Sequence, residues 1–316
     1  MEGMNQNQRI VENVLLWAVR IGLWIIPILP FYISSSMLFP FITGKNFAFR
    51  IIIELIAPLW IGLAIMRREF RPRLTPVVKA VTALIAVLFL ADIFGANPYR
   101  SFFSNYERME GFISFAHLYL YFLMLTSVFR IRRDWLIFFH VSIAASIVVS
   151  YIGLRQRLGY RPSLQGGFRV DSTIGNPTYL AAYLLFHLWL LGLLIKQFWP
   201  VRPDSHSSGY NPNTNIKRWI LMAVYMVIFL FELAIIYFTA TRGVALALLA
   251  VAVPFVAAVV FFWHTMFSWS SQGSRADRAS PQQWTRGRII AGIAFAVMVI
   301  IPVSFWFARS SRFVQE

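Results

Sequence analysis

The sequence predicts an all-α membrane protein, a polytopic bundle of about nine transmembrane helices. Composition is the first reason, because 58% of the 316 residues are hydrophobic, only 13% are charged and the mean hydropathy is +0.63. The second reason is that apolar segments of about 20 residues, the length a helix needs to cross a bilayer, recur along the chain. One soluble core cannot bury so much apolar sequence. We therefore expect a single transmembrane domain over residues 1–316.

Each apolar segment of sufficient length is expected to form one span. The first segment is too long for a signal-peptide core and lacks a small-residue cleavage site, so we expect it to remain in the protein. The chain has no cysteine, which excludes disulfides and thiolate metal sites. The expected spans are approximately 14–35, 46–66, 76–94, 111–129, 135–154, 174–195, 219–239, 243–263 and 289–308.

The basic residues predict the orientation of these spans. With the N-terminus inside, 17 of the 29 Lys and Arg residues fall on the inner side, 11 on the outer side, and Arg20 within the first span. Because basic residues favour the cytoplasmic side, this bias predicts a cytoplasmic N-terminus. The polar inner stretches 200–216 and 268–288 are expected to be connectors. The +16 net charge follows the membrane boundaries, and so it does not indicate nucleic-acid binding.

The segment 166–185 carries the most distinctive pattern: an arginine, a short polar loop, Asn-Pro and then an apolar helix. Proline fixes its own φ and disfavours the α conformation in the residue before it, so the helix is expected to begin at or just after Pro177. The first-turn amides and the positive end of the helix dipole would then lie beside Arg169. The pattern of Arg169, Asn176 and this helix start predicts an anion site suited to phosphate.

The segment 238–251 is the second distinctive stretch, because Arg242 lies in a very short connection between two spans. A short connection holds the guanidinium at the membrane face, toward the headgroup layer or a cavity that opens there. Arg100 and Arg108 occur among aromatic residues in the outer loop 95–110 and are further candidates for substrate binding. For any one of these residues, interface anchoring is an equal alternative.

Three carboxylates fall inside the spans, all in the half near the outer side: Glu54, Asp92 and Glu232. Arg50 precedes Glu54 by one helical turn, which predicts a charge pair on one helix face. The favoured interpretation is that these carboxylates pair with arginines and hold helices together, and the alternative is that they line an outward-facing polar cavity. The histidines of the spans are expected to be packing residues, and no spacing of His or carboxylates indicates a metal site.

The motifs that the chain lacks narrow the class of protein. Neither a phosphate-binding nucleotide loop nor a dinucleotide fingerprint occurs, and there is no Asp-x-Asp pair. The first outer loop, about 36–45, contains no carboxylate, which disfavours a metal-dependent membrane glycosyltransferase. These observations favour a metal-independent and cofactor-independent site in which arginines face a membrane-embedded pyrophosphate.

Three stretches resemble the motifs of the O-antigen ligase and polymerase superfamily of bacterial membrane proteins. They are FGANPYRSFFSNYERMEGFISFAHL at 94–118, STIGNPTYLAAYLL at 172–185 and TATRGVALALL at 239–249. The resemblance implies a bundle comparable to the GT-C glycosyltransferases in the bacterial inner membrane. It also implies that a glycan is transferred from undecaprenyl pyrophosphate, on the outer side, to lipid A core, to a polymer or to a protein, in the synthesis of lipopolysaccharide or another envelope polysaccharide.

Under this resemblance, Arg169 and Arg242 are the arginines that hold the donor pyrophosphate. The family also has a large periplasmic loop with a catalytic histidine in its ligases, and here the chain reaches Glu316 just after the ninth span. We therefore expect the natural protein to continue, with its catalytic base beyond Glu316. Three alternatives stay open: an O-antigen polymerase, a flippase or transporter for lipid-linked oligosaccharides, and a non-catalytic membrane scaffold.

Overall fold

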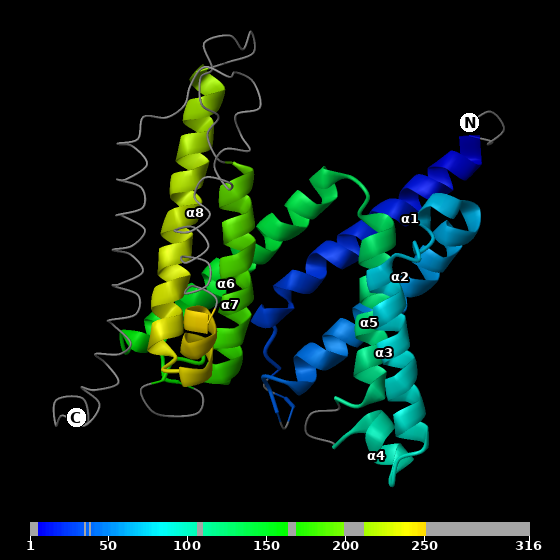
Figure 1. Cartoon of the computed structure of the whole chain (residues 1–316), viewed down its shortest axis with the longest axis horizontal. Coiled ribbons are helices and arrows are strands. Elements are labelled where there is room, and N and C mark those ends of the chain that lie inside the picture. The colour runs from blue at the N-terminus through cyan, green and yellow to red at the C-terminus, as the bar shows by residue number, and fades with distance from the viewer. Residues whose placement is uncertain are drawn as a thin grey trace, which may run out of the picture. The chain divides into compact units, whose positions relative to one another are not determined.

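A computed structural model describes residues 6–34, 36–37, 39–105, 110–163, 169–198 and 212–250 of the chain, and within these ranges the regular structure is helical, with no strand. The chain divides into two compact units, Met1–Ala240 and Thr241–Glu316. All the helices labelled in Figure 1 belong to the first unit. In the second unit, residues 242–250 are helical.

In its described part, the first unit has eight α-helices and two short 3-10 helices. Within the described residues, six helical segments are long and apolar enough to cross a membrane, and Phe112–Val128 is a shorter apolar helix. The elements are α1 (Gln6–Ile25), η1 (Ile26–Phe31), α2 (Thr43–Met66), η2 (Arg68–Phe70), α3 (Pro76–Ile93), α4 (Pro98–Phe103), α5 (Phe112–Val128), α6 (Arg132–Arg157), α7 (Pro177–Gln197) and α8 (Pro212–Phe238).

Seven of the expected spans coincide with helices of this unit, which agrees with an all-α, multi-pass membrane protein. The first span begins earlier than expected, at Gln6, and continues as 3-10 helix from Ile26, where Pro27 and Pro30 remove two amide donors from the helical pattern. The expected span 243–263 begins within the helical residues 242–250, and the rest of it lies outside the described residues. The expected span 289–308 also lies outside them.

A polar residue followed by proline starts three of the helices. Thr75 caps α3 by accepting from the Val78 amide, and Asn97 caps α4 by accepting from the Arg100 amide. Asn176 caps α7 in the same way, and a proline occupies the first helical position in all three. Because proline has no amide hydrogen and a helix-compatible φ, the pair fixes the residue at which each helix begins.

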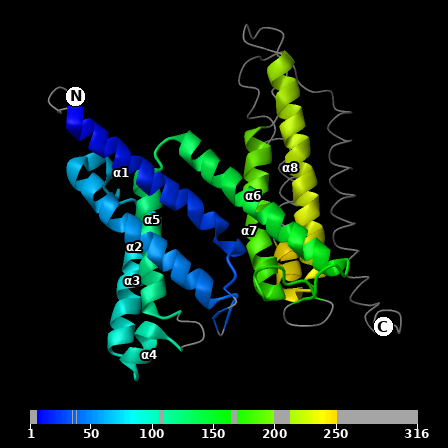
Figure 2. The ribbon, with the colours of Figure 1, turned by 180° about the vertical axis from the view of Figure 1, so that it is seen from behind.

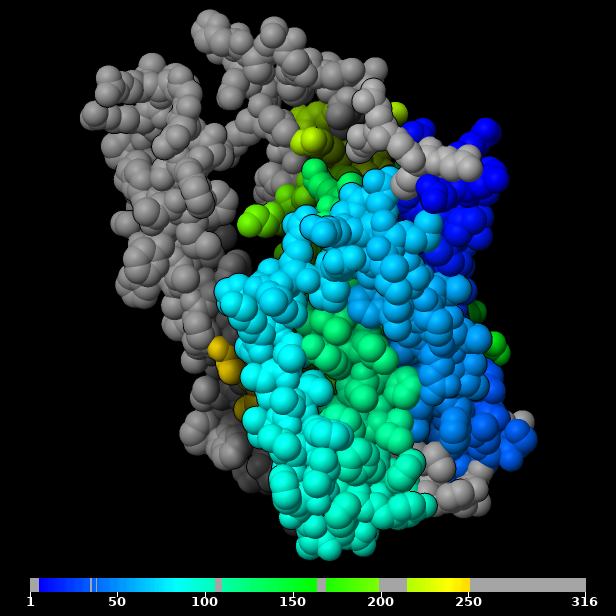
Figure 3. Space-filling model, turned by 90° about the vertical axis from the view of Figure 1, so that its right-hand side faces the viewer, coloured from blue at the N-terminus to red at the C-terminus, as the bar shows by residue number. Residues whose placement is uncertain are grey.

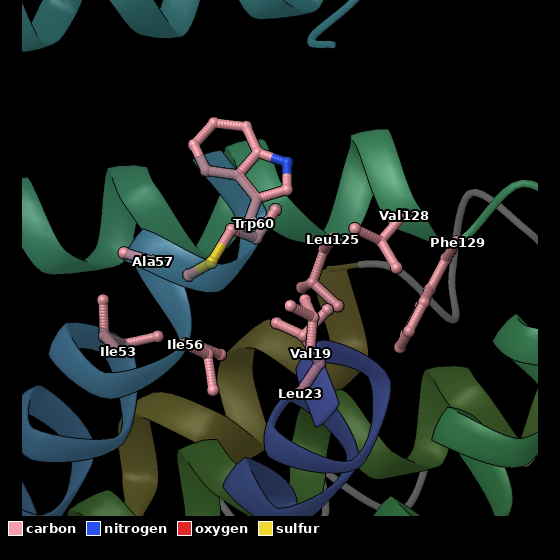
Figure 4. Close-up of a cluster of buried hydrophobic side chains, with 10 residues drawn as sticks. Val19, Leu23, Ile53, Ile56, Ala57, Trp60, Leu125, Val128 and Phe129 are labelled. Atoms are coloured by element: carbon pink, nitrogen blue, oxygen red, sulfur yellow. The ribbon is translucent and has the colours of Figure 1, made fainter. Parts of the chain in front are cut away.

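The main apolar core of the first unit lies where α1, α2 and α5 meet (Figure 4). Val19 and Leu23 of α1, Ile53 of α2 and Val128 of α5 are completely buried there. Trp60 of α2 packs in the same cluster, and its indole NH donates to Ser127 Oγ at 3.1 Å and to the Phe70 carbonyl at 3.2 Å. These bonds satisfy the one polar atom of a large core side chain, as burial of tryptophan requires.

Of the other helices, α3 packs against α5 of this core, whereas α7 and α8 pack against each other and against α6. On the face shown in Figure 3, α3 lies beside α5, and α2 lies on the other side of α5. Figures 1 and 2 show α7 and α8 side by side, with α6 inclined between this pair and the helices around the core. The contacts of α6 with η1, α7 and α8 join the two groups of helices.

Hydrogen bonds between loops and helix ends show that α1 and α2 run in opposite directions, and that α7 runs opposite to α6 and α8. The start of α2 and the ends of α6 and α8 all contact the 169–176 loop, which leads into α7. At the opposite end, Arg67 after α2 donates to Glu12 near the start of α1 at 2.9 Å. The 169–176 loop, the start of α2 and the ends of α6 and α8, which the sequence all assigns to the outer side, therefore lie at one end of the bundle. The side of the membrane that this end faces stays a prediction.

Cysteine labelling tests the predicted orientation. In this naturally cysteine-free chain, a single cysteine at Ser163 in the predicted outer loop is expected to react with a membrane-impermeant maleimide added to intact cells. A single cysteine at Ser207 in the predicted cytoplasmic loop is expected to react only after permeabilisation, because the basic-residue bias places it inside. Labelling of Ser207→Cys from outside the cell would show that the orientation is wrong.

Candidate functional site

The loop between α6 and α7 is built around the buried carboxylate of Asp171. Gln156 near the end of α6 donates from Nε2 to Asp171 Oδ1 at 2.8 Å, and Ser163 Oγ donates to Oδ2 at 3.0 Å. Gln156 also accepts, through Oε1, from the amides of Asp171 and Ser172. Gln156 thus joins both the Asp171 side chain and the loop backbone to α6. The Asp171 carboxylate is fully buried, and its hydrogen bonds are made within the protein.

The second half of this loop, residues 172–175, is bonded to α6 and α2. Ser172 has a positive φ of 51°, and its hydroxyl donates to the Val149 carbonyl of α6 at 2.6 Å. Lys45 in the first turn of α2 donates from Nζ to the Thr173 carbonyl. Gly175 has a φ of +74°, and a Cβ at this position would lie 2.6 Å from Cγ of Phe41. The loop therefore requires glycine at position 175 for two reasons, its backbone conformation and the lack of space.

Replacing Gly175 by alanine is expected to destabilise the protein by about 2–4 kcal/mol, because the left-handed conformation and the overlap with Phe41 each cost about 1–2 kcal/mol. Gly159→Ala is the matched control: Gly159 has a similar φ of +79°, and nothing lies within 4 Å of its Cβ position. Thermal unfolding in detergent measures both variants. Equal losses of stability in the two would show that Phe41 does not confine the loop at Gly175.

Arg169 is held at the C-terminal end of α8. Its Nε donates to the Thr239 carbonyl at 2.9 Å, and the next amide, of Val170, donates to the Phe238 carbonyl at 3.3 Å. These carbonyls lie at the negative end of the α8 dipole, where a cation is stabilised by about 0.3–1 kcal/mol. The guanidinium is half-buried, and the bond through Nε fixes its orientation.

Helix α7 begins at Pro177 as expected, but its first-turn amides are not available to an anion. Asn176 is the N-cap, and its Oδ1 accepts from the amides of Thr178 at 2.8 Å and Tyr179 at 3.4 Å. Pro177 has no amide hydrogen, and the Leu180 amide donates to the Asn176 carbonyl. All the first-turn donors of α7 are therefore used within the helix. A phosphate at this end would be bound by the cations Arg169 and Lys45 around the loop, with only the dipole contributed by α7.

The other arginines proposed for substrate binding lie elsewhere in the chain. Arg242 is exposed at the first position of the helical residues 242–250. It belongs to the second unit, so its convergence with Arg169 stays a prediction. Arg100 is exposed on α4, where its backbone amide donates to Asn97 Oδ1. Arg108 lies outside the described residues.

Arg50 and Glu54 interact electrostatically, and each also has a hydrogen-bond partner on α5 that the sequence does not predict. Glu54 Oε1 lies 3.0 Å from Nε2 of His117 on α5, while Arg50 donates to Ser114 Oγ one turn away at 2.5 Å. These contacts form because α2 and α5 run in the same direction, which places Arg50 and Glu54 opposite Ser114 and His117. His117 is a pairing residue, and the side chain of Glu54 remains 64% exposed.

The two other membrane carboxylates differ from each other. Asp92, near the end of α3, is partly exposed and makes no side-chain hydrogen bond or ion pair within the part of the chain that the structure describes. Glu232 on α8 is completely buried and meets Ser146 of α6 rather than an arginine. The expected pairing with arginine is therefore wrong for Glu232.

Three residues of the site were not found from the sequence as candidates. Lys45 had been counted only as an outer basic residue, and Asp171 and Gln156 carried no motif of their own. Asp171 stands five residues before the Asn176–Pro177 helix start, in a polar segment that no helix can include, and this is the signal that would have indicated a loop anchor.

Chemically, the loop offers cations rather than acids or metal ligands. Arg169 and Lys45 lie around it, and both carboxylate oxygens of Asp171 accept hydrogen bonds from within the protein. Among the described residues, no group of three His, Asp or Glu side chains is able to hold a metal. This arrangement is suited to binding an anion by charge and donated hydrogen bonds. No protein-family model, curated protein or solved structure matches the chain.

Proposed function

We propose that this protein is an O-antigen ligase-like membrane glycosyltransferase, which transfers a glycan from undecaprenyl pyrophosphate to an acceptor on the outer side of the bacterial inner membrane. One observation carries the proposal. Two cations lie around the 169–176 loop at one end of the bundle: Arg169 donates to the Thr239 carbonyl just after α8, and Lys45 donates to the Thr173 carbonyl. A GT-C-like arrangement of the spans belongs to the same proposal.

The pyrophosphate of the donor would be bound by Arg169 and Arg242 together. Thr239, which holds Arg169, precedes Arg242 by three positions in the sequence, a reach of about 11 Å at full extension. Two planar guanidinium groups can neutralise the charge that develops when the bond between sugar and phosphate breaks. The leaving pyrophosphate then needs no proton. The base that would activate the acceptor is not assigned to a residue.

Binding of undecaprenyl pyrophosphate to the full chain in lipid nanodiscs tests this proposal. We expect saturable binding that EDTA leaves unchanged, and clearly weaker binding of undecaprenyl phosphate, because one phosphate can engage fewer of the donors. Undecaprenol, which has the same lipid tail and no phosphate, is the control and is expected not to compete. Equal competition by undecaprenol, or loss of binding in EDTA, would contradict the proposed site.

A transporter of lipid-linked oligosaccharides is a second candidate, and the buried Glu232 of α8 favours it. A completely buried ionisable group in a span is a common feature of ion-coupled transport. Proteoliposomes loaded with a fluorescent lipid-linked glycan separate the two functions. A transporter moves the intact lipid to the other leaflet, whereas a transferase releases undecaprenyl pyrophosphate only when an acceptor is present.

A further inference from the structure

Glu232 lies inside the interface between α6, α7 and α8. It is 0% exposed and precedes the end of α8 by six residues, a depth of about 9 Å along the helix axis. Its Oε1 contacts Ser146 Oγ of α6. Its Oε2 is buried and has no hydrogen-bond partner.

The contact with Ser146 allows two arrangements: Ser146 Oγ donates to Glu232 Oε1, or the carboxyl group donates to Ser146. The Ser146 hydroxyl is within 2.9 Å of the Ile143 carbonyl of its own helix, an acceptor that can only receive a hydrogen bond. A serine hydroxyl has one hydrogen and cannot donate it fully to both the carbonyl and the carboxylate. If Ser146 donates to Ile143, the close contact with Glu232 requires that the carboxyl group supply a proton of its own.

Other groups around Glu232 do not neutralise its charge. No described lysine or arginine forms an ion pair with it. His187 of α7 is occupied, because its Nδ1 lies 2.8 Å from the Tyr183 carbonyl and its Nε2 lies 2.9 Å from Ser142 Oγ. The titratable side chains that these three helices contribute to the interface are His140, Tyr183, His187 and Tyr225.

Two further polar atoms near this level lack protein partners. The Tyr183 hydroxyl, which interacts electrostatically with Glu232, is buried without a hydrogen bond. The Ser150 hydroxyl is also buried without one, and it lies one turn beyond Ser146 toward the 169–176 loop. Beyond Ser150, the Ser172 side chain contacts α6 at Val149. A line of hydroxyl groups therefore leads from Glu232 toward the loop end of the bundle.

We propose that Glu232 is a proton-binding site inside the membrane domain, formed by its carboxyl group with Ser146, and that its proton exchanges by way of the hydroxyl line at Ser150. An isolated carboxylate at this position would cost several kcal/mol, whereas the neutral acid can donate to Ser146. A site of this kind binds a proton in one state of the protein and releases it in another. It is independent of the glycan-donor site proposed for the 169–176 loop.

The reagent N,N'-dicyclohexylcarbodiimide tests this proposal because it reacts with protonated carboxyl groups in apolar surroundings. The acid proton moves to a nitrogen of the carbodiimide and the carboxylate oxygen bonds to its central carbon. An oxygen-to-nitrogen shift of the acyl group then gives a stable N-acylurea, with no group lost. The full chain in nanodiscs is treated with the reagent, and peptide mass spectrometry locates the adduct.

We expect the adduct on Glu232 and not on Glu69, an exposed carboxylate of η2 that serves as the control. Between about pH 6 and about pH 9, the labelling rate is expected to fall by at least about tenfold as the site loses its proton. The mapping uses the unmodified protein, so it does not depend on a variant that folds. Glu232→Gln is expected to fold and to show no adduct at this position, because glutamine keeps the shape and the contact with Ser146.

Two outcomes would overturn the assignment. Absence of the Glu232 adduct across the whole pH range would show that the carboxyl is not an exchangeable acid. Slower labelling in sodium chloride than in choline chloride, at the same pH and ionic strength, would show that the oxygens bind sodium rather than a proton. Equal rates in the two salts, together with the pH dependence, support the proton site.

Discussion

Arg169→Lys and Arg242→Lys are each expected to weaken the binding of undecaprenyl pyrophosphate by about 10- to 100-fold, which corresponds to the 1.5–3 kcal/mol of a hydrogen bond to a charged group. Lysine keeps the charge and loses the two-pronged geometry that holds a phosphate in a fixed orientation. At position 169 it also loses the Nε bond to the Thr239 carbonyl, which orients the guanidinium. Titration of the donor lipid against each purified variant measures the effect.

Arg155→Lys is the matched control, because Arg155 is exposed at the end of α6 beside the same loop. It is expected to leave donor affinity unchanged. Thermal unfolding of all three variants separates a loss of binding from a loss of folding, since only Arg169 among them holds a loop to a helix end. Unchanged affinity in both Arg169→Lys and Arg242→Lys would remove the pyrophosphate assignment.

The convergence of these two arginines has a direct geometric test. Because the chain has no cysteine, Arg169→Cys and Arg242→Cys can be combined and joined by thiol-specific crosslinkers of increasing length. Two groups that share one pyrophosphate must lie within about 15 Å of each other, so a short crosslinker is expected to join them. Crosslinking only by the longest reagents would separate the two arginines and leave Arg169 with Lys45 as the anion site.

The length of the apolar segments predicts seven of the spans, because every helix that crosses a lipid bilayer needs about 20 mostly apolar residues. The start of α7 was equally predictable, since Pro177 and Asn176 define a helix start by local geometry alone. The boundaries of the first span were less accurate. Its polar N-terminal turns are helical although they are not apolar, and its prolines alter the helix without ending the span.

The partners of the polar side chains were much harder to predict. Spacing along one helix relates Glu54 to Arg50, whereas its hydrogen bond with His117 depends on the parallel packing of α2 and α5, which the sequence does not reveal. Asp171 and Gln156 meet because the chain returns to α6. Each of these contacts depends on how helices pack, and hydrophobic patterns do not determine this for helices surrounded by lipid.

The buried pair of Arg20 and Asp134 is the strongest example of such a contact. Arg20 lies within the first span, and Asp134 lies 114 residues later in the first turn of α6. Their atoms NH2 and Oδ2 are 2.9 Å apart, and the side chains are only 16% and 4% exposed. Asp134 is also favourably placed at the positive end of the α6 dipole. The pair joins α1 to α6, and hence one group of helices to the other.

Asp134→Leu is therefore expected to destabilise the protein by about 3–5 kcal/mol, because it leaves the Arg20 charge buried without a partner. Thermal unfolding in detergent, followed by tryptophan fluorescence, should show a melting temperature lower by about 6 °C or more. Arg133→Gln removes an exposed charge one residue away and is expected to have almost no effect. The double variant Arg20→Met with Asp134→Leu should regain most of the loss, since apolar residues of similar volume can replace a buried ion pair. A double variant no more stable than Asp134→Leu would show that the aspartate acts through α6 itself and not through Arg20.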